Sequence, residues 1–279
     1  MSLNNDESAW YNMGNALLFL GKLEDAVAAF KKQIEIVPSH EQAWHDMGIA
    51  LSDLGKLDEA IAAFKKQIEI MPNHELAWHS MGNTLYSLGK LDEAIAAFKK
   101  QIEITPNHKS AWNNMGSALY SLGKLNEALA AYQKQIEVMP NHKEVWNNMG
   151  ITLLFLGKLE DAVAAFKKQI EIVPSHEQAW HSMGIALSDL GKLDEAIAAY
   201  QKQIEIMPNH ELAWYSMGIA LSKQGKLEDA VAAFKKQIEI NPGHRAAVFA
   251  LCLTLSKSDR ARHSANTAAL WPGLISRCF

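Results

Sequence analysis

The chain has 279 residues, 48% of them hydrophobic, and a formal net charge of −4 at pH 7. This apolar fraction suffices for a packed core and excludes a disordered chain, while the mixed charges lack the basic stripe of a nucleic-acid-binding protein. No apolar run approaches the ~20 residues of a membrane-spanning helix, so neither nucleic acid nor a membrane is expected as a partner.

Residues 1–6 form a polar extension without the basic and apolar regions of a secretory signal. The two cysteines, Cys252 and Cys278, are too few for a disulfide framework and lie near the C-terminal end. Together these features predict a reduced protein located in the cytoplasm.

From residue 7 onward, one pattern recurs every 34 residues. Seven of the eight prolines and fourteen of the sixteen glycines follow this step. A fixed period of this length indicates tandem copies of one supersecondary unit, which stack into a solenoid. The copies span 7–40, 41–74, 75–108, 109–142, 143–176, 177–210 and 211–244, and each contains one tryptophan: Trp10, Trp44, Trp78, Trp112, Trp146, Trp180 and Trp214.

The second copy, residues 41–74, shows how the first half of each unit folds. Apolar residues recur at helical spacing from Ala43 to Leu54, which predicts an amphipathic helix. Ser39, with Gln42 three residues later, has the pattern of a capping box at its start. Gly55 ends the helix, because glycine best tolerates the left-handed conformation of the residue that follows a helix.

A second amphipathic helix follows after a very short connection. Its apolar residues run from Ala60 to Ile70, its first turn is acidic and its later part is basic, in agreement with the helix dipole. Pro72 stops it, since proline cannot continue a helix. Each copy is therefore predicted to be a helical hairpin.

Gly48 lies inside the first helix, where glycine costs about 1 kcal/mol relative to alanine. The same glycine recurs in all seven copies. We expect a close contact at the point where the second helix crosses the first, with Ala60 as the small residue on the opposite side.

The order Trp-x-x-Met-Gly-x-x-Leu, then Ala-x-x-x-Phe, then Pro within 34 residues resembles the tetratricopeptide repeat. This resemblance covers residues 7–244 and implies an all-α fold, a right-handed superhelical solenoid of helix-turn-helix repeats. One departure is Gln67, which replaces the small residue usual near the end of the second helix and recurs in every copy. These glutamines either lean into solvent or form a buried ladder of amides, and the sequence leaves both interpretations open.

The repeat fails after residue 244. Val248 occupies the tryptophan position and Cys252 the internal glycine position, and no second helix follows. Residues 245–257 are therefore predicted to be a single helix that covers the last repeat, as solenoids require. Residues 258–279 form a tail that is first basic and then apolar, with Trp271, Leu274, Ile275 and Phe279.

No pattern of catalytic or metal-binding residues is present. His40 and His45 resemble the histidine pair of zinc proteases, but they are five residues apart instead of four and so point to different sides of a helix. The glycine turns lack the serine or threonine of a phosphate-binding loop. We therefore expect no enzymatic activity, no metal and no cofactor.

The resemblance also implies where a ligand binds. In such arrays the first helices line a concave groove, and the variable positions 2, 5, 6, 9, 12 and 13 of each repeat contact the ligand. Amide and imidazole groups at these positions can donate and accept hydrogen bonds along an extended peptide. The predicted peptide-binding residues are Tyr11, Asn12, Asn15, His45, Asp46, His79, Asn83, Asn113, Asn114, Asn147, Asn148, His181 and Tyr215.

Family members that bind chaperones clamp a C-terminal carboxylate with lysine and arginine. Asn83 and Asn114 match the asparagines of that clamp, but His79, Glu144 and Asn148 stand where its basic residues belong. A carboxylate clamp is therefore not expected.

Two functions remain open. The first is an adaptor or scaffold whose groove holds a peptide or helix of a partner protein. The second is a structural protein that self-assembles through its ends or through the apolar tail, whose large side chains offer anchors for association.

Overall fold

The computed structural model describes residues 8–262, with side chains described as far as Lys257. These residues form fifteen α-helices and contain no β-strand. The protein therefore has the expected all-α fold, a solenoid of helix-turn-helix repeats. It divides into two compact units, of which unit 1 ends at His142 and unit 2 begins at Lys143.

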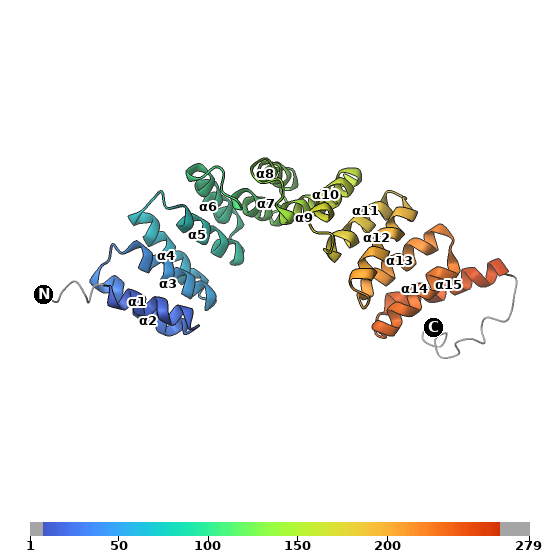
Figure 1. Cartoon of the computed structure of the whole chain (residues 1–279), viewed down its shortest axis with the longest axis horizontal. Helices are drawn as coiled ribbons and strands as arrows, with labels where there is room; N and C mark the ends of the chain where they lie inside the picture. The colour runs from blue at the N-terminus through green and yellow to red at the C-terminus, as the bar shows by residue number, and fades with distance from the viewer. Residues whose placement is uncertain (1–7, 263–279) are drawn as a thin grey trace. The chain divides into compact units, whose positions relative to one another are not determined.

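Unit 1 consists of helical hairpins. Each odd-numbered helix packs against the even-numbered helix that follows it, and each even-numbered helix packs against the first helix of the next hairpin in the unit (Figure 1). The helices of unit 1 are α1 (Ala9–Phe19), α2 (Leu23–Ile36), α3 (Glu41–Asp53), α4 (Leu57–Ile70), α5 (Glu75–Ser87), α6 (Leu91–Ile104), α7 (Ala111–Ser121) and α8 (Leu125–Val138).

Unit 2 repeats the same arrangement and ends in a single helix that packs against α14. Its helices are α9 (Lys143–Phe155), α10 (Leu159–Ile172), α11 (Glu177–Asp189), α12 (Leu193–Ile206), α13 (Glu211–Gln224), α14 (Leu227–Ile240) and α15 (Arg245–Arg262).

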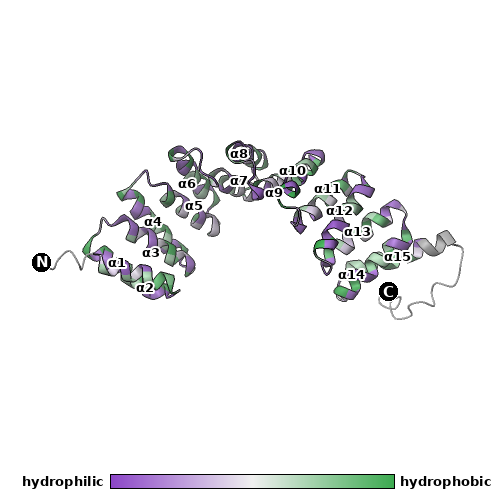
Figure 2. Cartoon of the chain, in the orientation of Figure 1, coloured by the Kyte–Doolittle hydropathy of each residue, from purple (hydrophilic) through white to green (hydrophobic). Residues whose placement is uncertain are grey.

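The predicted hairpin and its turn are confirmed. Helix α3 is followed by Gly55 with φ of 75°, the left-handed conformation that favours glycine. Helix α4 ends at Ile70, two residues before Pro72. Hydrophobic and hydrophilic stretches alternate along the helices (Figure 2), so that each buries one face between its neighbours.

The start of the first helix differs from the prediction. The N-cap of α3 is His40 rather than Ser39, and its Nδ1 atom accepts a hydrogen bond from the backbone N–H of Ala43 at 3.1 Å. His176 caps α11 in the same way at 3.2 Å. Because the histidine is extended and directly precedes the first helical residue, its ring reaches the exposed N–H groups that a cap satisfies.

The internal glycine does mark a close contact, but the opposing residue is not Ala60. A Cβ atom added to Gly48 would lie 2.6 Å from Cε1 of Phe64 on α4, closer than atoms can approach. Ala60 is fully buried one turn earlier on the same helix. The same contact joins Gly14 to Phe30, Gly82 to Phe98, Gly116 to Tyr132, Gly150 to Phe166, Gly184 to Tyr200 and Gly218 to Phe234.

The repeated tryptophan joins one hairpin to the loop before it. The indole N–H of Trp44 donates to the carbonyl oxygen of Pro38 at 2.9 Å, and that of Trp78 donates to Pro72 at 2.8 Å. Both tryptophan side chains are half-buried and lie at the edge of the core. On α1, which has no hairpin before it among the described residues, Trp10 is 37% exposed.

The closing helix is longer than predicted. Helix α15 runs from Arg245 to Arg262 and buries Ala247 and Leu251. It passes residue 257 because residues 258–262 contain neither glycine nor proline. The extension 1–6 and the apolar residues of the tail lie outside the described residues.

We predict that Gly82→Ala destabilises unit 1, although alanine is the better helix former. The added methyl group meets the ring of Phe98 at 2.6 Å, and forcing such an overlap costs about 1–3 kcal/mol, against about 1 kcal/mol of improved helix propensity. Urea denaturation followed by circular dichroism measures the difference. Lys99→Ala, an exposed change on α6, is the control and should leave the midpoint unchanged. A Gly82→Ala midpoint at or above that of the wild type would contradict the packing role of the glycine.

Candidate functional site

The predicted binding residues of unit 1 lie on the first helices of its hairpins. We call the surface made by positions 5, 6 and 9 of α1, α3, α5 and α7 the A-helix face. On α1 and α3, the hydroxyl of Tyr11 donates to the carboxylate of Asp46 at 2.9 Å. Burial and the nearby Asp46 raise the pKa of Tyr11, which an additional hydrogen bond with Asn15 partly offsets. The tyrosine hydroxyl is thus a neutral donor held by a carboxylate of the next hairpin.

Three predicted residues on α5 and α7 form a continuous hydrogen-bonded chain. Nε2 of His79 lies 3.0 Å from Nδ2 of Asn83, one helical turn later. The Oδ1 atom of Asn83 accepts from Nδ2 of Asn114 on the neighbouring hairpin at 3.2 Å. We call these three residues the amide chain. It links two hairpins and places two primary amides on one surface.

Tyrosine extends this surface beyond the amide chain. Tyr86 on α5 is 39% exposed, and its hydroxyl lies 3.1 Å from the hydroxyl of Ser121 on α7. Tyr86 is at position 12 of its repeat and Ser121 is at position 13 of the next one. The resemblance assigns both positions to ligand contact. Polar groups of α5 and α7 therefore bridge the two helices at two levels.

The repeated glutamine at the end of each second helix is buried. Its exposed fraction is 0% or 1% in all seven copies, so the buried-amide interpretation is confirmed and the solvent-facing one is wrong. In three hairpins its Oε1 atom lies close to the position-5 histidine: His45–Gln67 at 2.8 Å, His79–Gln101 at 3.3 Å and His181–Gln203 at 2.8 Å. In two others it accepts from the position-5 backbone N–H, Tyr11 to Gln33 and Asn113 to Gln135, both at 3.2 Å.

The histidine at the end of each repeat closes this arrangement from the other side. Nε2 of Gln67 lies 3.4 Å from Nδ1 of His74, and Gln203 lies 3.3 Å from His210 in the same manner. The paired rings of His181 and His210 are 6.0 Å apart. We call each group of position-5 residue, glutamine and repeat-end histidine a seam. The signal for the seams in the sequence is the shared 34-residue spacing of these histidines and the glutamines.

Burial in the seams changes the titration of two histidines. Burial lowers the pKa of His181 below its usual value of 6.5, the hydrogen bond with Gln203 opposes this, and the neighbouring His210 lowers it further. Burial likewise lowers the pKa of His79. Both rings are therefore neutral at pH 7. His181 is only 8% exposed, so its ring offers little surface to a ligand.

The predicted residues of unit 2 lie in other surroundings. Asn147 and Asn148 are half-buried on α9, and the ring of Tyr215 on α13 lies 5.2 Å from that of His244. Position 9 of its hairpins carries isoleucine, where α5 carries Asn83. The amide chain defined above joins α5 and α7.

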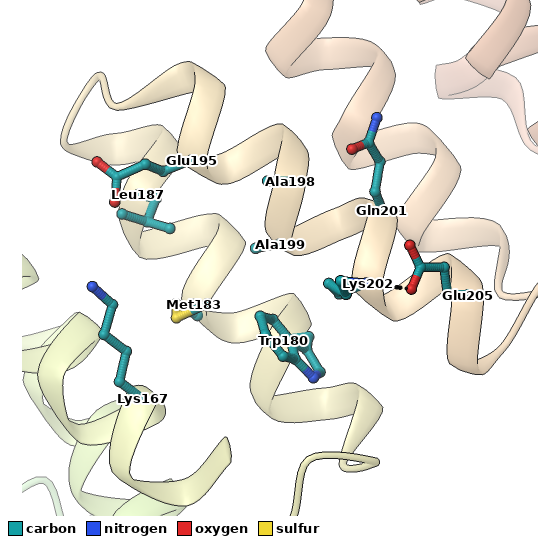
Figure 3. Close-up of a pocket in the computed structure, with 10 residues that line it drawn as sticks. All are labelled: Lys167, Trp180, Met183, Leu187, Glu195, Ala198, Ala199, Gln201, Lys202 and Glu205. Carbon is teal, nitrogen blue, oxygen red and sulfur yellow. Dashed lines mark hydrogen bonds and ion pairs between the residues drawn. The ribbon is translucent and has the colours of Figure 1, made fainter. Parts of the chain in front are cut away.

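Unit 2 also contains a pocket of about 370 Å³ between α10, α11 and α12 (Figure 3). Trp180, Met183 and Leu187 give it an apolar lining, and the ion pair of Lys202 with Glu205 (2.6 Å) lies at its edge. None of the predicted binding residues lines it. The pocket therefore lies apart from the predicted peptide-binding surface.

No helix among residues 8–262 is long and apolar enough to cross a membrane. The same part of the chain contains no group of three or more histidine, cysteine, aspartate or glutamate side chains placed to hold a metal ion.

Comparison with protein families identifies the repeat along most of the chain. Models described as "Tetratricopeptide repeat" match residues 7–40, 41–74, 107–175 and 212–244, and one described as "TPR repeat" matches residues 82–123 and 186–225. A search of curated proteins found no match.

Solved structures share the fold. The C-terminal part of a TPR repeat-containing protein from Cytophaga hutchinsonii is 16% identical, with a TM-score of 0.76, over 86% of this chain and 99% of that one. YrrB, described as a TPR protein with an unusual peptide-binding site, is 24% identical, with a TM-score of 0.60, over 67% of this chain and 97% of that one. The MamA protein is 26% identical, with a TM-score of 0.59, over 62% of this chain and 94% of that one.

We predict that two chemically identical substitutions in the seams have different effects. Gln203→Met keeps the side-chain shape but leaves the buried His181 without its partner, which costs about 1–3 kcal/mol. Gln237→Met should be neutral or stabilising, because neither amide atom of Gln237 has a partner among the described residues. Urea denaturation of both variants measures this contrast, and equal destabilisation would show that the seam hydrogen bonds contribute nothing.

We also predict that the protein loses stability in mild acid. A folded-state pKa below the unfolded value means that the stabilisation from a neutral histidine is complete above about pH 6.5 and is lost as pH falls below it, until the lower folded pKa is reached. His181→Asn, which places at position 5 the residue found in Asn147, should reduce this loss. Thermal unfolding at several pH values provides the measurement; a variant with the same pH dependence as the wild type would contradict the assignment to His181.

Proposed function

Since the chain belongs to the tetratricopeptide repeat family, we propose that it is a protein-interaction scaffold whose A-helix face in unit 1 binds an extended peptide of a partner protein. The proposal concerns binding and not catalysis. The observation that carries it is the amide chain, which holds Asn83 and Asn114 side by side on α5 and α7.

Primary amides suit a peptide backbone because each can donate and accept at once. In the amide chain, Asn114 uses one N–H hydrogen for Asn83, which leaves its other N–H hydrogen and its carbonyl oxygen for a ligand. A peptide bond presents the complementary pair, and contacts with the backbone tolerate many side chains. Tyr86 adds an exposed aromatic ring at the edge of this surface.

The charges of this surface favour a neutral backbone segment over a carboxylate. His79 is neutral at pH 7, since burial lowers its pKa. Asp46 places a negative charge on α3 and is held by Tyr11. Because the amide chain carries no positive charge, binding to it should depend little on salt.

Self-association is the second candidate. Apolar side chains on α1 and at its C-cap are open to solvent, with Met13 44%, Phe19 92% and Leu20 66% exposed. In later hairpins the residues equivalent to Met13 are largely covered by the preceding second helix; Met47 and Met81, for example, are 6% and 7% exposed. A second copy of the chain could cover this edge of α1.

The chain itself supplies the substitutions for a binding test. His79→Asn, Asn83→Ile and Asn114→Ser each introduce a residue that another repeat carries at the same position, so the triple variant should fold. A peptide selected on the full chain from a random phage-displayed library should bind this variant at least about tenfold more weakly, since each 1.4 kcal/mol of lost contacts is a factor of ten. Calorimetry measures the affinity.

The control exchanges residues of the second helices in the same way. Lys65→Gln with Lys99→Gln introduces the glutamine found at Gln133 and Gln201 and should not alter affinity. Undiminished binding by the triple variant would contradict the proposed site. Light scattering of the same samples tests the second candidate: a wild-type chain that assembles but selects no peptide would favour self-association.

A further inference from the structure

We propose that His79 is a positioning residue that sets which atoms of the amide chain donate and which accept hydrogen bonds. The protonation state of His79 thereby determines whether the amide oxygen or the amide nitrogen of Asn114 faces a given backbone group of a bound peptide. The inference rests on the proposed function, because it concerns the specificity of the same surface. It extends that function by connecting the surface to a buried group beneath it.

The order of donors and acceptors along the chain is fixed by its buried end. Gln101 on α6 is 0% exposed, and its Oε1 atom lies 3.3 Å from Nδ1 of His79. A carbonyl oxygen only accepts hydrogen bonds, so Nδ1 of His79 carries a hydrogen. The neutral ring then has its lone pair on Nε2, and this atom accepts from Nδ2 of Asn83 at 3.0 Å.

The same direction continues to the surface. With its nitrogen turned to His79, Asn83 turns its Oδ1 atom to Nδ2 of Asn114, which donates at 3.2 Å. Each donor and acceptor in the series Asn114, Asn83, His79, Gln101 is thus determined by the buried oxygen of Gln101. Asn114 is left with its carbonyl oxygen and one N–H in fixed positions.

Protonation of His79 reverses the outer part of the series. Nε2 gains a hydrogen and then faces the N–H₂ group of Asn83, so that two donors meet at a distance suited to a hydrogen bond. Rotation of the Asn83 amide by half a turn relieves this conflict and places its nitrogen against that of Asn114, which must rotate in turn. The oxygen and nitrogen of Asn114 then exchange places on the surface, and a peptide that matched the neutral state meets like groups.

The surroundings of His79 keep it neutral at pH 7 and allow it to titrate in mild acid. Burial lowers its pKa, the hydrogen bond with Gln101 and the carboxylate of Glu75 on α5 raise it, and His108, which precedes α7, lowers it. The rings of His79 and His108 are 5.6 Å apart. On α3, the charged Asp46 is held by Tyr11. The remaining partners on α6 and α7, Gln101 and Asn114, are uncharged.

The pairing of histidine at position 5 with asparagine at position 9 occurs in one repeat, which provides natural controls. His45 and His181 contact the equivalent glutamines, but position 9 of their repeats is Ile49 and Ile185, which cannot continue the chain. Position 5 of the fourth repeat is Asn113. Among the seven repeats only the third combines histidine at position 5 with asparagine at position 9.

Nuclear magnetic resonance on the full chain tests the orientation without any ligand. Between about pH 7.5 and pH 5, the range in which histidine titrates, the side-chain amide signals of Asn83 and Asn114 should shift together with the ring nitrogens of His79, at one midpoint below pH 6.5. His79→Asn should abolish both shifts, and His45→Asn should leave them intact. Amide signals that do not move with pH, or that still move in His79→Asn, would overturn the inference.

Binding tests the consequence for specificity. A peptide selected on the wild-type chain at about pH 7.5 should lose about tenfold in affinity at pH 5, the effect expected when one buried or partly buried pair becomes mismatched. The affinity of His79→Asn for that peptide should change less than about twofold over the same range. Equal pH dependence in both proteins would overturn the specificity role. Coupled amide shifts without any selected peptide would instead refute the proposed function and leave the orientation by His79 in place.

Discussion

The close approach of a glycine to an aromatic ring determines how each hairpin is built. At Gly48 and its six equivalents the first helix has no Cβ, and the ring of the second helix occupies that space. Three residues after the ring, about one helical turn, comes the glutamine. The contact that brings the helices together therefore also carries an amide into the interior, next to position 5 of the first helix.

A buried amide is destabilising unless it has partners, and three repeats provide partners for both of its ends, in two different ways. Gln67 and Gln203 lie between two histidines, and Gln135 accepts from the backbone N–H of Asn113 and donates to the carbonyl oxygen of Lys109. The variable position 5 is thus constrained from within as well as by any ligand. Hydrogen bonds in polar networks of this kind strengthen one another when every group is paired. The residue at position 5 therefore affects the stability of the hairpin as well as the surface that the hairpin presents.

The A-helix face illustrates how a repeated scaffold becomes specific. The packing residues are nearly the same in every copy, so the hairpins present positions 6 and 9 in equivalent places. On α5, His79 contacts Asn83, and Asn83 contacts Asn114 of the adjacent hairpin on α7, which forms a chain of hydrogen bonds. A small number of exchanges among otherwise equal units therefore suffices to create a distinct surface, and the exchanged residues are ones that the scaffold accepts elsewhere.

The sequence alone determined the hairpin, its turn at Gly55, its end at Pro72 and the family, because these depend on helical periodicity, backbone conformation and a 34-residue period. It also indicated that Gly48 marks a close contact. Only the tertiary structure decided that Phe64 rather than Ala60 fills that contact, that His40 rather than Ser39 caps the helix, and that the glutamines are buried. The reason is physical: periodicity shows which face of a helix is apolar, but the partner of a side chain depends on where the next helix crosses it, and the amide chain of His79, Asn83 and Asn114 exists only once two hairpins are packed together.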